Sequence, residues 1–389
     1  PDLNKKTHQT RRIKMKKIKL PSFTQTASVL TLSLAAAMPA VSAQSQEVVN
    51  FFNWSDYIAE DTVARFTKET GIKVVSDTFD SNDTLEAKLL TGNSGYDLVV
   101  PSISYMARQA QAGVFMPLDK NELPNTKHLD KGIMASLSGL DKDNKYGVPY
   151  LWGTTGIGYN IDLVKKYLGE DAPVDSWDLV FKPENMKKLA ACGVTFINSA
   201  DEVFPLVLNY LGQDPNSEKK SDYKKNSAGA KLLRDVKPYI KQFSSTTYIS
   251  DLASGEICVA VGYNGDMLQA RARAEEAGNG INIAYTIPKE GTSMWFDMLA
   301  IPSDAKNAAA AHKFVNFLMR PDVIADVTNY VWYANPNTSA TKLLDKDISS
   351  DAGIYPSDEV RKNLFTQNIR KPKLNKMLNR LWVDMKTGR

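Results

Sequence analysis

Apolar runs of strand length alternate with amphipathic segments of helix length over residues 48–111. This pattern predicts strands at 48–52, 72–79 and 97–101, and helices at 58–70, 82–90 and 102–111. Gly71 and Gly92 follow the first two helices and are expected to end them. Strands separated by helices of this length are typical of β-α-β units, so we expect an α/β fold around a largely parallel sheet.

The pattern changes after about residue 145, where two extended segments lead into a mixture of helices and strands. The extended segments lie at 146–151 and 155–160, the expected helices at 162–168, 183–191, 200–212, 228–240, 266–277 and 307–319, and the expected strands at 257–262, 281–287 and 294–301. Residues 44–389 exceed the size at which one hydrophobic core usually keeps growing. We therefore expect two α/β lobes with a ligand cleft between them. The predicted lobes are residues 44–150 with 281–330, and residues 151–280 with 331–389.

The first 43 residues have the pattern of a secretory signal peptide. Lysines closely follow Met15, an apolar stretch covers residues 27–38, and small residues lead up to Ala43. A basic start, a short apolar stretch and small residues before a cut define such peptides, so we expect cleavage after Ala43 and export to the periplasm. The apolar stretch is too short to span a bilayer. Residues 1–14 are expected to lie upstream of the signal.

The positive charge of the chain is concentrated in this first segment. The whole chain has a net charge of +4, but residues 1–43 contain eight Lys or Arg and one Asp, so residues 44–389 carry −3. A nucleic-acid partner requires a basic face, and no stretch of residues 44–389 concentrates one. We therefore expect no nucleic-acid partner.

The chain contains two cysteines, Cys192 and Cys258. In an exported protein an even number of cysteines predicts a disulfide. Closing a loop of this length would stabilise the fold by roughly 4 kcal/mol in the chain-entropy model. Two free, buried thiols are the alternative.

Residues 44–389 offer few groups for catalysis. Their histidines, His128 and His312, have no His, Cys or acidic partner at metal-ligand spacing, and no Gly-x-Ser-x-Gly elbow is present. The glycine-rich stretch at 153–158 lacks the Lys-Ser/Thr of a phosphate-binding loop. We expect neither an enzyme nor a metal or cofactor site.

Acidic residues stand beside aromatic residues at three points of the chain. Asp56 follows the first predicted strand, Asp266 follows the strand at 257–262, and Asp297 lies inside the last predicted strand. Asp56 and Asp266 have a simpler interpretation as N-caps of the helices that follow them. Asp297 is the strongest indication of a site, because burying a carboxylate is costly unless a cation or strong donors meet it.

These acid-aromatic loops predict a cationic ligand. Ligands of open α/β sheets bind beyond the carboxyl ends of the strands, where the loops begin. Carboxylates supply counter-charge for ammonium groups, and each aromatic face attracts a cation by roughly 0.5–2 kcal/mol. Several acids along an aromatic-lined slot fit a linear molecule with a charge at each end. An anionic ligand would require Arg or exposed helix N-termini, which these loops do not offer.

Six motifs, in order along residues 44–389, resemble the polyamine-binding periplasmic proteins of ABC importers. They are residues 53–57 (Asn-Trp-Ser-Asp-Tyr), 96–102 (Tyr-Asp-Leu-Val-Val-Pro-Ser), 156–160 (Gly-Ile-Gly-Tyr-Asn), 175–178 (Asp-Ser-Trp-Asp), 257–263 (Ile-Cys-Val-Ala-Val-Gly-Tyr) and 287–291 (Ile-Pro-Lys-Glu-Gly). The resemblance implies the two-lobed type II periplasmic binding protein fold, closure around the ligand and delivery to a membrane permease. It also implies that Cys192 and Cys258 pair.

The resemblance further implies a set of ligand-binding residues. They are Trp54, Ser55, Asp56, Tyr57, Ser102, Glu202, Tyr263, Asp266, Trp295, Asp297, Tyr333 and Gln367. Three of them depart from the putrescine-type pattern: Tyr263 stands where Trp is usual, Trp295 where Phe is usual, and Gln367 where Leu is usual. The ligand implied is therefore putrescine, spermidine or both.

The resulting hypothesis is a monomeric periplasmic receptor that captures a polyamine and delivers it to the permease of an ABC importer. A binding protein for another cationic solute is an alternative, as is a sensing subunit that presents the polyamine to a membrane receptor. An amino-acid ligand would require an Arg for its carboxylate, and a metal ligand would require a cluster of His, Tyr and Asp.

Overall fold

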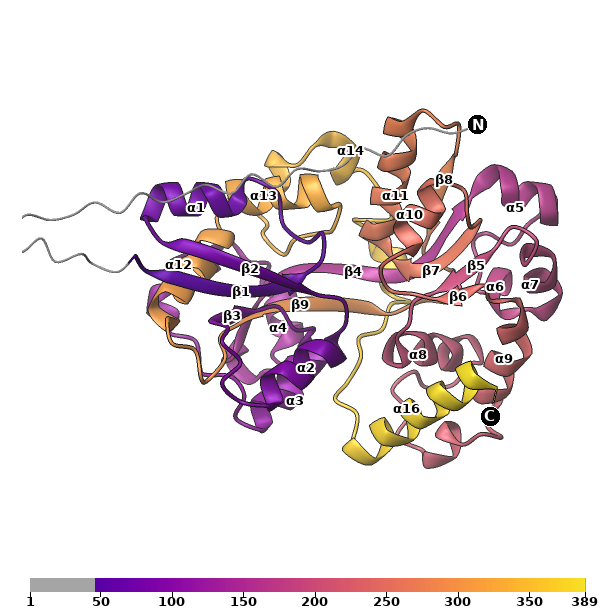
Figure 1. Ribbon diagram of the computed structural model, residues 1–389, viewed down its shortest axis with the longest axis horizontal. Helices are drawn as coiled ribbons and strands as arrows, with labels where there is room; N and C mark the ends of the chain where they lie inside the picture. Colours follow the sequence, from indigo (N-terminus) through magenta and orange to yellow (C-terminus); the bar gives the residue numbers. More distant parts are fainter. Residues whose placement is uncertain (1–45, 389) are drawn as a thin grey trace, which may run out of the picture. The chain divides into compact units, whose positions relative to one another are not determined.

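The computed structural model describes residues 46–388, so the predicted signal peptide and its cleavage at Ala43 lie outside the described residues. Within that range nine strands form one sheet in the order β2-β1-β3-β9-β4-β7-β5-β6, with β8 paired to β4 (Figure 1). The strands are β1 Val48–Trp54, β2 Lys73–Phe79, β3 Leu98–Val99, β4 Gly147–Asn160, β5 Val194–Phe196, β6 Gln242–Phe243, β7 Val259–Tyr263, β8 Ile283–Thr286 and β9 Met294–Ala300.

The sheet is parallel at both ends and antiparallel in the middle. β1 pairs in parallel with β2 and β3, and β5 pairs in parallel with β6 and β7. β9 is antiparallel to β3 and β4, and β4 is also antiparallel to β7 and β8. The prediction of a largely parallel sheet was therefore wrong at the centre. The chain passes along β4 in one direction and returns along β9 in the other, without the crossover helix that parallel neighbours need.

The three helices expected before residue 112 lie close to their predicted positions. The described residues contain sixteen α-helices. They are α1 Thr62–Thr70, α2 Asn82–Leu90, α3 Ile103–Gln111, α4 Lys131–Leu137, α5 Ile161–Leu168, α6 Asp178–Phe181, α7 Pro183–Leu189, α8 Ala200–Tyr210, α9 Ala228–Val236, α10 Tyr248–Ala253, α11 Asn264–Ala277, α12 Ala308–Leu318, α13 Pro321–Val331, α14 Lys346–Ser349, α15 Asp358–Arg361 and α16 Pro372–Thr387. The short 3-10 helices are η1 Lys120–Glu122, η2 Pro124–His128, η3 Lys142–Asn144, η4 Lys220–Tyr223, η5 Lys237–Tyr239 and η6 Thr341–Leu343.

Local chemistry explains where the first helices begin and end. Ser81 caps α2 by accepting a hydrogen bond from the backbone N–H of Thr84, as Ser does at many helix N-termini. Gly71 ends α1 in the left-handed conformation, with φ of 75°. The helix predicted at 58–70 starts only at Thr62. Turns occupy most of the residues before it, and they leave this stretch free to line a site.

Hydrophobic side chains form separate clusters at the two ends of the sheet. One cluster combines residues between Ile157 and Ile283 with the apolar face of α16. Two further clusters combine residues 49–152 with residues 295–354, and one of them also includes Leu268 of α11. Figure 1 shows helices on both sides of each end: α1 and α2 lie on opposite sides of β1 and β2, and α11 and α8 on opposite sides of β7. Each end of the sheet thus has a core of its own.

The hydrophobic clusters differ from the predicted lobe limits at several residues. Tyr333 and Ala334, predicted in the second lobe, pack in the clusters that contain Phe51 and Phe52 of β1. Ile283 of β8, predicted in the first lobe, packs in the cluster at the other end. We propose lobe limits that follow the clusters, with residues 331–354 in the first lobe and β8 in the second.

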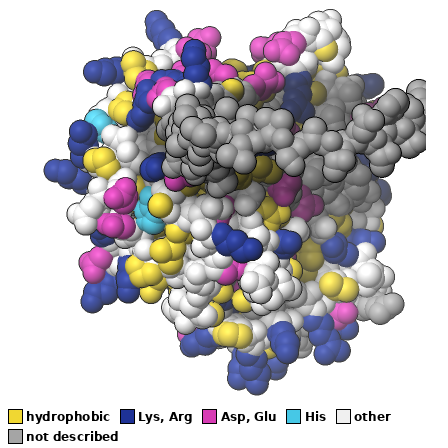
Figure 2. Space-filling view, turned by 60° about the vertical axis from the view of Figure 1, so that its left-hand side comes forward, with side chains coloured by type: hydrophobic (Ala, Val, Ile, Leu, Met, Phe, Trp, Pro, Cys, Tyr) yellow, Lys and Arg dark blue, Asp and Glu magenta, His cyan; other side chains and the backbone are white. Residues whose placement is uncertain are grey.

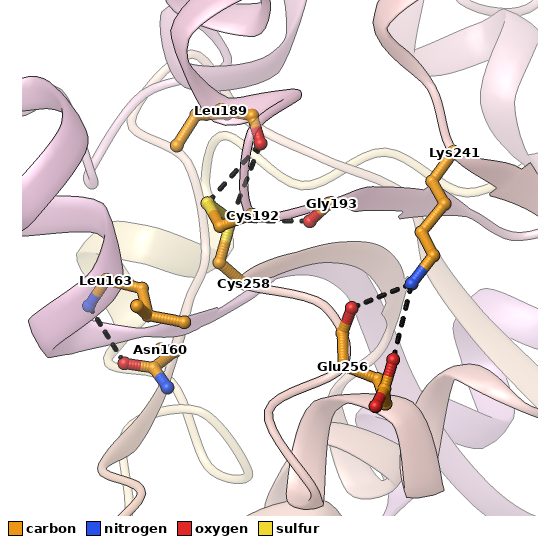
Figure 3. Close-up of a disulfide and its surroundings, with 8 residues drawn as sticks. All are labelled: Asn160, Leu163, Leu189, Cys192, Gly193, Lys241, Glu256 and Cys258. Atoms are coloured by element: carbon orange, nitrogen blue, oxygen red, sulfur yellow. Dashed lines mark hydrogen bonds and ion pairs between the residues drawn. A yellow bond between two sulfur atoms is a disulfide. The ribbon is translucent and has the colours of Figure 1, made fainter.

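The disulfide prediction is confirmed. Cys192, just after α7, and Cys258, just before β7, have sulfur atoms 2.06 Å apart and Cα atoms 5.4 Å apart (Figure 3). The backbone N–H of Cys258 also donates to the carbonyl of Gly193 at 2.9 Å. The bond therefore joins two segments that already neighbour each other at one edge of β7.

Lys and Arg side chains are interspersed with Asp and Glu side chains on the face in Figure 2. Among the described residues, every helix is too short or too polar to cross a membrane.

Candidate functional site

A pocket of about 160 Å³ lies between the two ends of the sheet. Its walls come from the segment after β1, from β9, from the first turns of α8 and α11, and from the segment that follows α13. Of the twelve residues predicted for the site, eleven line it: Trp54, Ser55, Asp56, Tyr57, Ser102, Glu202, Tyr263, Asp266, Trp295, Asp297 and Tyr333. The structure thus gathers side chains from both ends of the sheet around one space.

Two side-chain hydrogen bonds to one backbone carbonyl hold the loop after β1 in place. The side-chain amide of Asn53 donates to the carbonyl of Tyr57 at 3.2 Å, and the Tyr150 hydroxyl donates to the same carbonyl at 3.0 Å. Asp56 has a left-handed backbone with φ of 53°, an uncommon conformation that Asp tolerates better than most residues. It does not cap α1, whose N-cap is Asp61. The N-cap interpretation of Asp56 is therefore wrong.

Asp297 is buried in the middle of β9, where it accepts hydrogen bonds but has no counter-ion among residues 46–388. Its Oδ1 accepts from the Ser102 hydroxyl at 2.6 Å, and its Oδ2 accepts from the Tyr57 hydroxyl at 2.9 Å. Asn82 in turn holds Ser102, because its side-chain amide donates to the Ser102 hydroxyl at 2.9 Å. Burial raises the pKa of Asp297 to about 7, and the two hydroxyl donors oppose that rise.

Asp266 occupies the first turn of α11, where the N-cap is Tyr263. The N-cap interpretation of Asp266 is therefore wrong as well. The side chain instead accepts hydrogen bonds from the hydroxyls of Tyr248 and Tyr333, the latter at 2.5 Å. Burial raises the pKa of Asp266 to about 6, and these two donors act against the rise.

Glu202 supplies a third, half-buried carboxyl from the first turn of α8. Ser199 caps this helix by accepting from the backbone N–H of Glu202 at 3.3 Å. The Thr155 hydroxyl, on β4, donates to Oε2 of Glu202 at 3.0 Å. Burial raises the pKa of Glu202 to about 7, with smaller contributions from the charges of Asp201 and Asp297.

A connected series of aromatic rings lines the same space. The Tyr263 and Trp295 rings meet edge to face with centroids 5.4 Å apart, and Trp295 meets Tyr333 at the same distance. Tyr333 continues to Tyr57 at 5.1 Å. Edge-to-face rings hold one another in place, so these rings form a firm wall beside the three carboxyls.

Gln367 is the predicted residue that the main pocket leaves out. It lines a smaller cavity, which shares Ser102, Glu202 and Trp295 with the main pocket. The Gln367 side-chain amide lies 3.5 Å from the hydroxyl of Ser293. Gln367 is therefore placed beside the Glu202 and Trp295 end of the pocket.

The electrostatic character of the pocket follows from these three carboxyls. None of Asp266, Asp297 and Glu202 forms a salt bridge with a residue in the range 46–388. At the pocket edge, Asp56 lies 3.7 Å from Arg273, and both side chains are about half exposed. Buried negative charge without a counter-ion attracts cations and rejects anions. No group of three or more His, Cys, Asp or Glu among the described residues is arranged to hold a metal.

The sequence profile of the bacterial extracellular solute-binding proteins matches residues 61–356. The chain belongs to this family.

Individual members of the solute-binding family match over nearly the whole chain. The chain is 52% identical over 360 residues to the putrescine-binding periplasmic protein PotF of Escherichia coli strain K12, covering 92% of this chain and 97% of PotF. It is 51% identical over 363 residues to the putrescine-binding periplasmic protein SpuD of Pseudomonas aeruginosa strain UCBPP-PA14, covering 93% and 98%.

A solved structure of a related substrate-binding protein agrees with the fold. The spermidine/putrescine ABC transporter substrate-binding protein PotD from Streptococcus pneumoniae is 28% identical, with a TM-score of 0.72 over 88% of this chain and 99% of that one. The predicted type II binding-protein fold and the resemblance on which it rested are confirmed.

Sequence reasoning missed five residues that line the pocket. They are Phe79, Asp80, Ser245, Thr246 and Ile249. Phe79 ends β2 and Asp80 follows it, so the rule that ligands bind beyond strand ends would have found both. The other three precede or begin α10 in a polar stretch whose sequence has no distinguishing pattern. Only the packing of α10 on α11 and β7 brings that stretch to the pocket.

Proposed function

We propose that this protein is a periplasmic receptor that captures a linear polyamine of the putrescine class and delivers it to the permease of an ABC importer. The observation that carries the proposal is a set of three carboxyls beside a wall of aromatic rings, Asp297 buried and Asp266 and Glu202 half-buried, with no counter-ion among residues 46–388. The names of the two relatives that are more than half identical support putrescine as the solute.

The proposed ligand supplies what the pocket lacks. Each ammonium group of a polyamine would neutralise a carboxylate and donate to its free lone pairs. The methylene chain between the ammonium groups would lie against the rings of Tyr263, Trp295 and Tyr333. Removing that chain from water contributes about 0.8 kcal/mol for each buried methylene.

Calorimetry with a set of matched solutes tests the proposal. Putrescine, cadaverine, spermidine and spermine are titrated into the purified protein, together with 4-aminobutyrate as the control. The control keeps an amino group and carries a carboxylate at its other end. We expect binding of at least one polyamine and no heat with 4-aminobutyrate. Binding of 4-aminobutyrate and not of the diamines would contradict a polyamine receptor.

Spermidine is a second candidate ligand, favoured by two residues. The indole of Trp295 offers a larger face than the Phe usual at this position, and Gln367 carries an amide oxygen that accepts from an ammonium group. The smaller cavity beside Glu202 and Gln367 lies where a longer ligand would extend. We expect spermidine to bind at least as tightly as putrescine. The effect of one ring is about 1 kcal/mol, so Trp295→Phe should shift the ratio of the two affinities by several-fold.

The periplasmic location and the transport role are also part of the proposal. The signal-like segment before Ala43 and the periplasmic relatives support export. Mass spectrometry of the native protein tests export, because a mature chain should begin at Gln44. Uptake of labelled putrescine by cells that lack the protein distinguishes import from sensing, since a sensing subunit would leave uptake intact. A monomer is expected by light scattering.

A further inference from the structure

Asp266 lines the pocket, and its carboxylate accepts hydrogen bonds from two tyrosine hydroxyls. Tyr333 donates to Oδ1 at 2.5 Å and accepts from the backbone N–H of Asp266 at 3.1 Å. Tyr248, the first residue of α10, donates to Oδ2. Tyr333 lines the pocket, whereas Tyr248 does not and is fully buried.

Two glycines on either side of Tyr263 make room for these rings. A Cβ on Gly262 would lie 2.9 Å from the ring of Tyr248, and a Cβ on Gly265 would lie 2.4 Å from the ring of Tyr333. The end of β7 and the start of α11 therefore leave space for one tyrosine each, on the two sides of Asp266. This arrangement points to a purpose for Tyr248 beyond filling the core.

We propose that Tyr248 is a positioning residue for polyamine binding: it fixes the Asp266 carboxylate toward the pocket and holds it in the charged form that an ammonium group needs. The inference rests on the proposed function and deepens it. A buried hydroxyl needs a partner, and the Asp266 carboxylate is the acceptor that Tyr248 has. A hydrogen bond to the charged form of an acid favours that form.

Other groups near Asp266 also change the pKa of its carboxyl. Tyr333 donates to the carboxylate from the segment after α13. The charge of Asp56, from the loop after β1, raises the pKa of Asp266, and the charge of Arg273, on α11, lowers it. The hydroxyls of Tyr57 and Tyr263 also lie within electrostatic range. Only Tyr248 and Tyr333 donate hydrogen bonds to the side chain among the described residues.

The test compares the wild-type protein with Tyr248→Phe by calorimetry with putrescine between pH 5.5 and 8.5. We expect the variant to bind up to about tenfold more weakly at pH 5.5 and within about twofold of wild type at pH 8.5, because a charge-assisted hydrogen bond shifts the titration of its acid by about one unit. A loss that is equal at every pH would overturn the proposal, because an effect on the charge of Asp266 must weaken as pH rises, and no loss at any pH would overturn it as well.

The matched control is Tyr210→Phe. The Tyr210 hydroxyl donates to the Asp178 carboxylate at 2.7 Å, and neither residue lines the pocket. This variant removes the same kind of hydrogen bond elsewhere, so its affinity and pH profile should match wild type.

A measurement without ligand keeps the inference separate from the proposed function. The carboxyl ¹³C signal of Asp266 is titrated in the empty protein, where Tyr248→Phe should move its midpoint upward by about one pH unit. An unchanged midpoint overturns the inference even if putrescine binds, and a shifted midpoint supports it even if putrescine does not. Should Tyr248→Phe fail to fold, 3-fluorotyrosine at position 248 keeps the ring shape and donates more strongly. It should move the midpoint downward, and an unmoved midpoint again overturns the inference.

Discussion

Asp297 stands in an apolar strand and is held by two hydroxyl donors rather than by a cation. Asp266 has the same arrangement on the other side of the pocket, with two tyrosine hydroxyls as donors. Hydroxyl donors orient a carboxylate without neutralising it, so the charge stays available to a ligand. The pocket acids differ in this respect from surface acids of the chain, many of which form salt bridges with Lys or Arg.

Replacing either acid by its amide should therefore remove binding while the fold remains. We expect Asp266→Asn and Asp297→Asn each to weaken putrescine binding by about 2–5 kcal/mol, the usual cost of losing one partner of a desolvated charge pair. Asp358→Asn is the control, because the Asp358 side chain is 93% exposed on α15. Calorimetry measures the affinities and circular dichroism the fold. Affinity near wild type in both pocket variants would rule out the assigned roles.

The raised pKa values predict how binding depends on pH. The empty pocket holds Asp266 with a pKa of about 6, and Asp297 and Glu202 with pKa values of about 7. A bound ammonium favours the charged carboxylate and lowers these values, so binding releases protons below about pH 7. Affinity should fall as pH falls from 8 to 5.5, by at least about tenfold. Calorimetry in buffers of different ionisation enthalpy should detect proton release near pH 6.5, and its absence would contradict this account.

Single residues were predictable where the chemistry was unusual. Asp297 was found because a carboxylate inside an apolar strand requires an explanation. Tyr248 was not found, because a tyrosine at the start of a short helix has an ordinary appearance in sequence. Its importance arises from the packing of α10 against α11, which no local pattern encodes.

Among the elements, β4 has the widest reach. Its first half pairs with β9 and its second half with β7 and β8, so one strand runs through both ends of the sheet. Its sequence suggested two extended segments divided by glycines. Gly153 instead lies within the strand, where it pairs with Trp295. The position requires glycine, because a Cβ there would lie 2.3 Å from the Asn264 side chain and 2.7 Å from the Trp295 ring.

Elements with strong local signals were predictable and the others were not. α2 matches its predicted limits because Ser81 caps its start and its buried Leu85 and Leu89 lie four residues apart. β5 and β6 are too short to show a period, with three and two residues. α16 was missed, although its buried Leu374, Leu378 and Leu381 have helical spacing.

The disulfide belongs to the element scale, because it joins the end of α7 to the start of β7. Protein taken from the periplasm should show no free thiol when it is titrated under denaturing, non-reducing conditions. The double variant Cys192→Ala, Cys258→Ala should lose roughly 2–4 kcal/mol of stability. Its putrescine affinity should change much less, since neither cysteine lines the pocket. Two titratable thiols would contradict the disulfide.

At the level of the whole molecule, the pocket residues span positions 54 to 333 and come from both clusters. The two-lobed fold was predictable from length and pattern, whereas the assignment of segments to each lobe stays a proposal. Contacts such as that between the Tyr57 and Tyr333 rings decide which end of the sheet the segment after α13 joins. Such contacts join residues far apart in sequence, and a single sequence does not reveal them.

Ligand binding should therefore stiffen the region between the clusters. At a putrescine concentration of 100 times the dissociation constant, the protein should gain about 2.7 kcal/mol of stability. Hydrogen exchange should slow at Trp152 and Thr155, whose backbone N–H groups donate to Ala334 and Ser293. The amides of α16, which lies outside the pocket, serve as the internal reference. Equal slowing everywhere would indicate general stabilisation rather than a local effect.

Because the pocket is lined from both ends of the sheet, the solute is itself a cross-link between the hydrophobic cores at those ends. One ammonium group would tether the side of Asp266, and the other the side of Asp297. The Cys192–Cys258 bond fastens segments within one core permanently. The polyamine would link one core to the other reversibly, so a partner that separates the two cores would also release the solute.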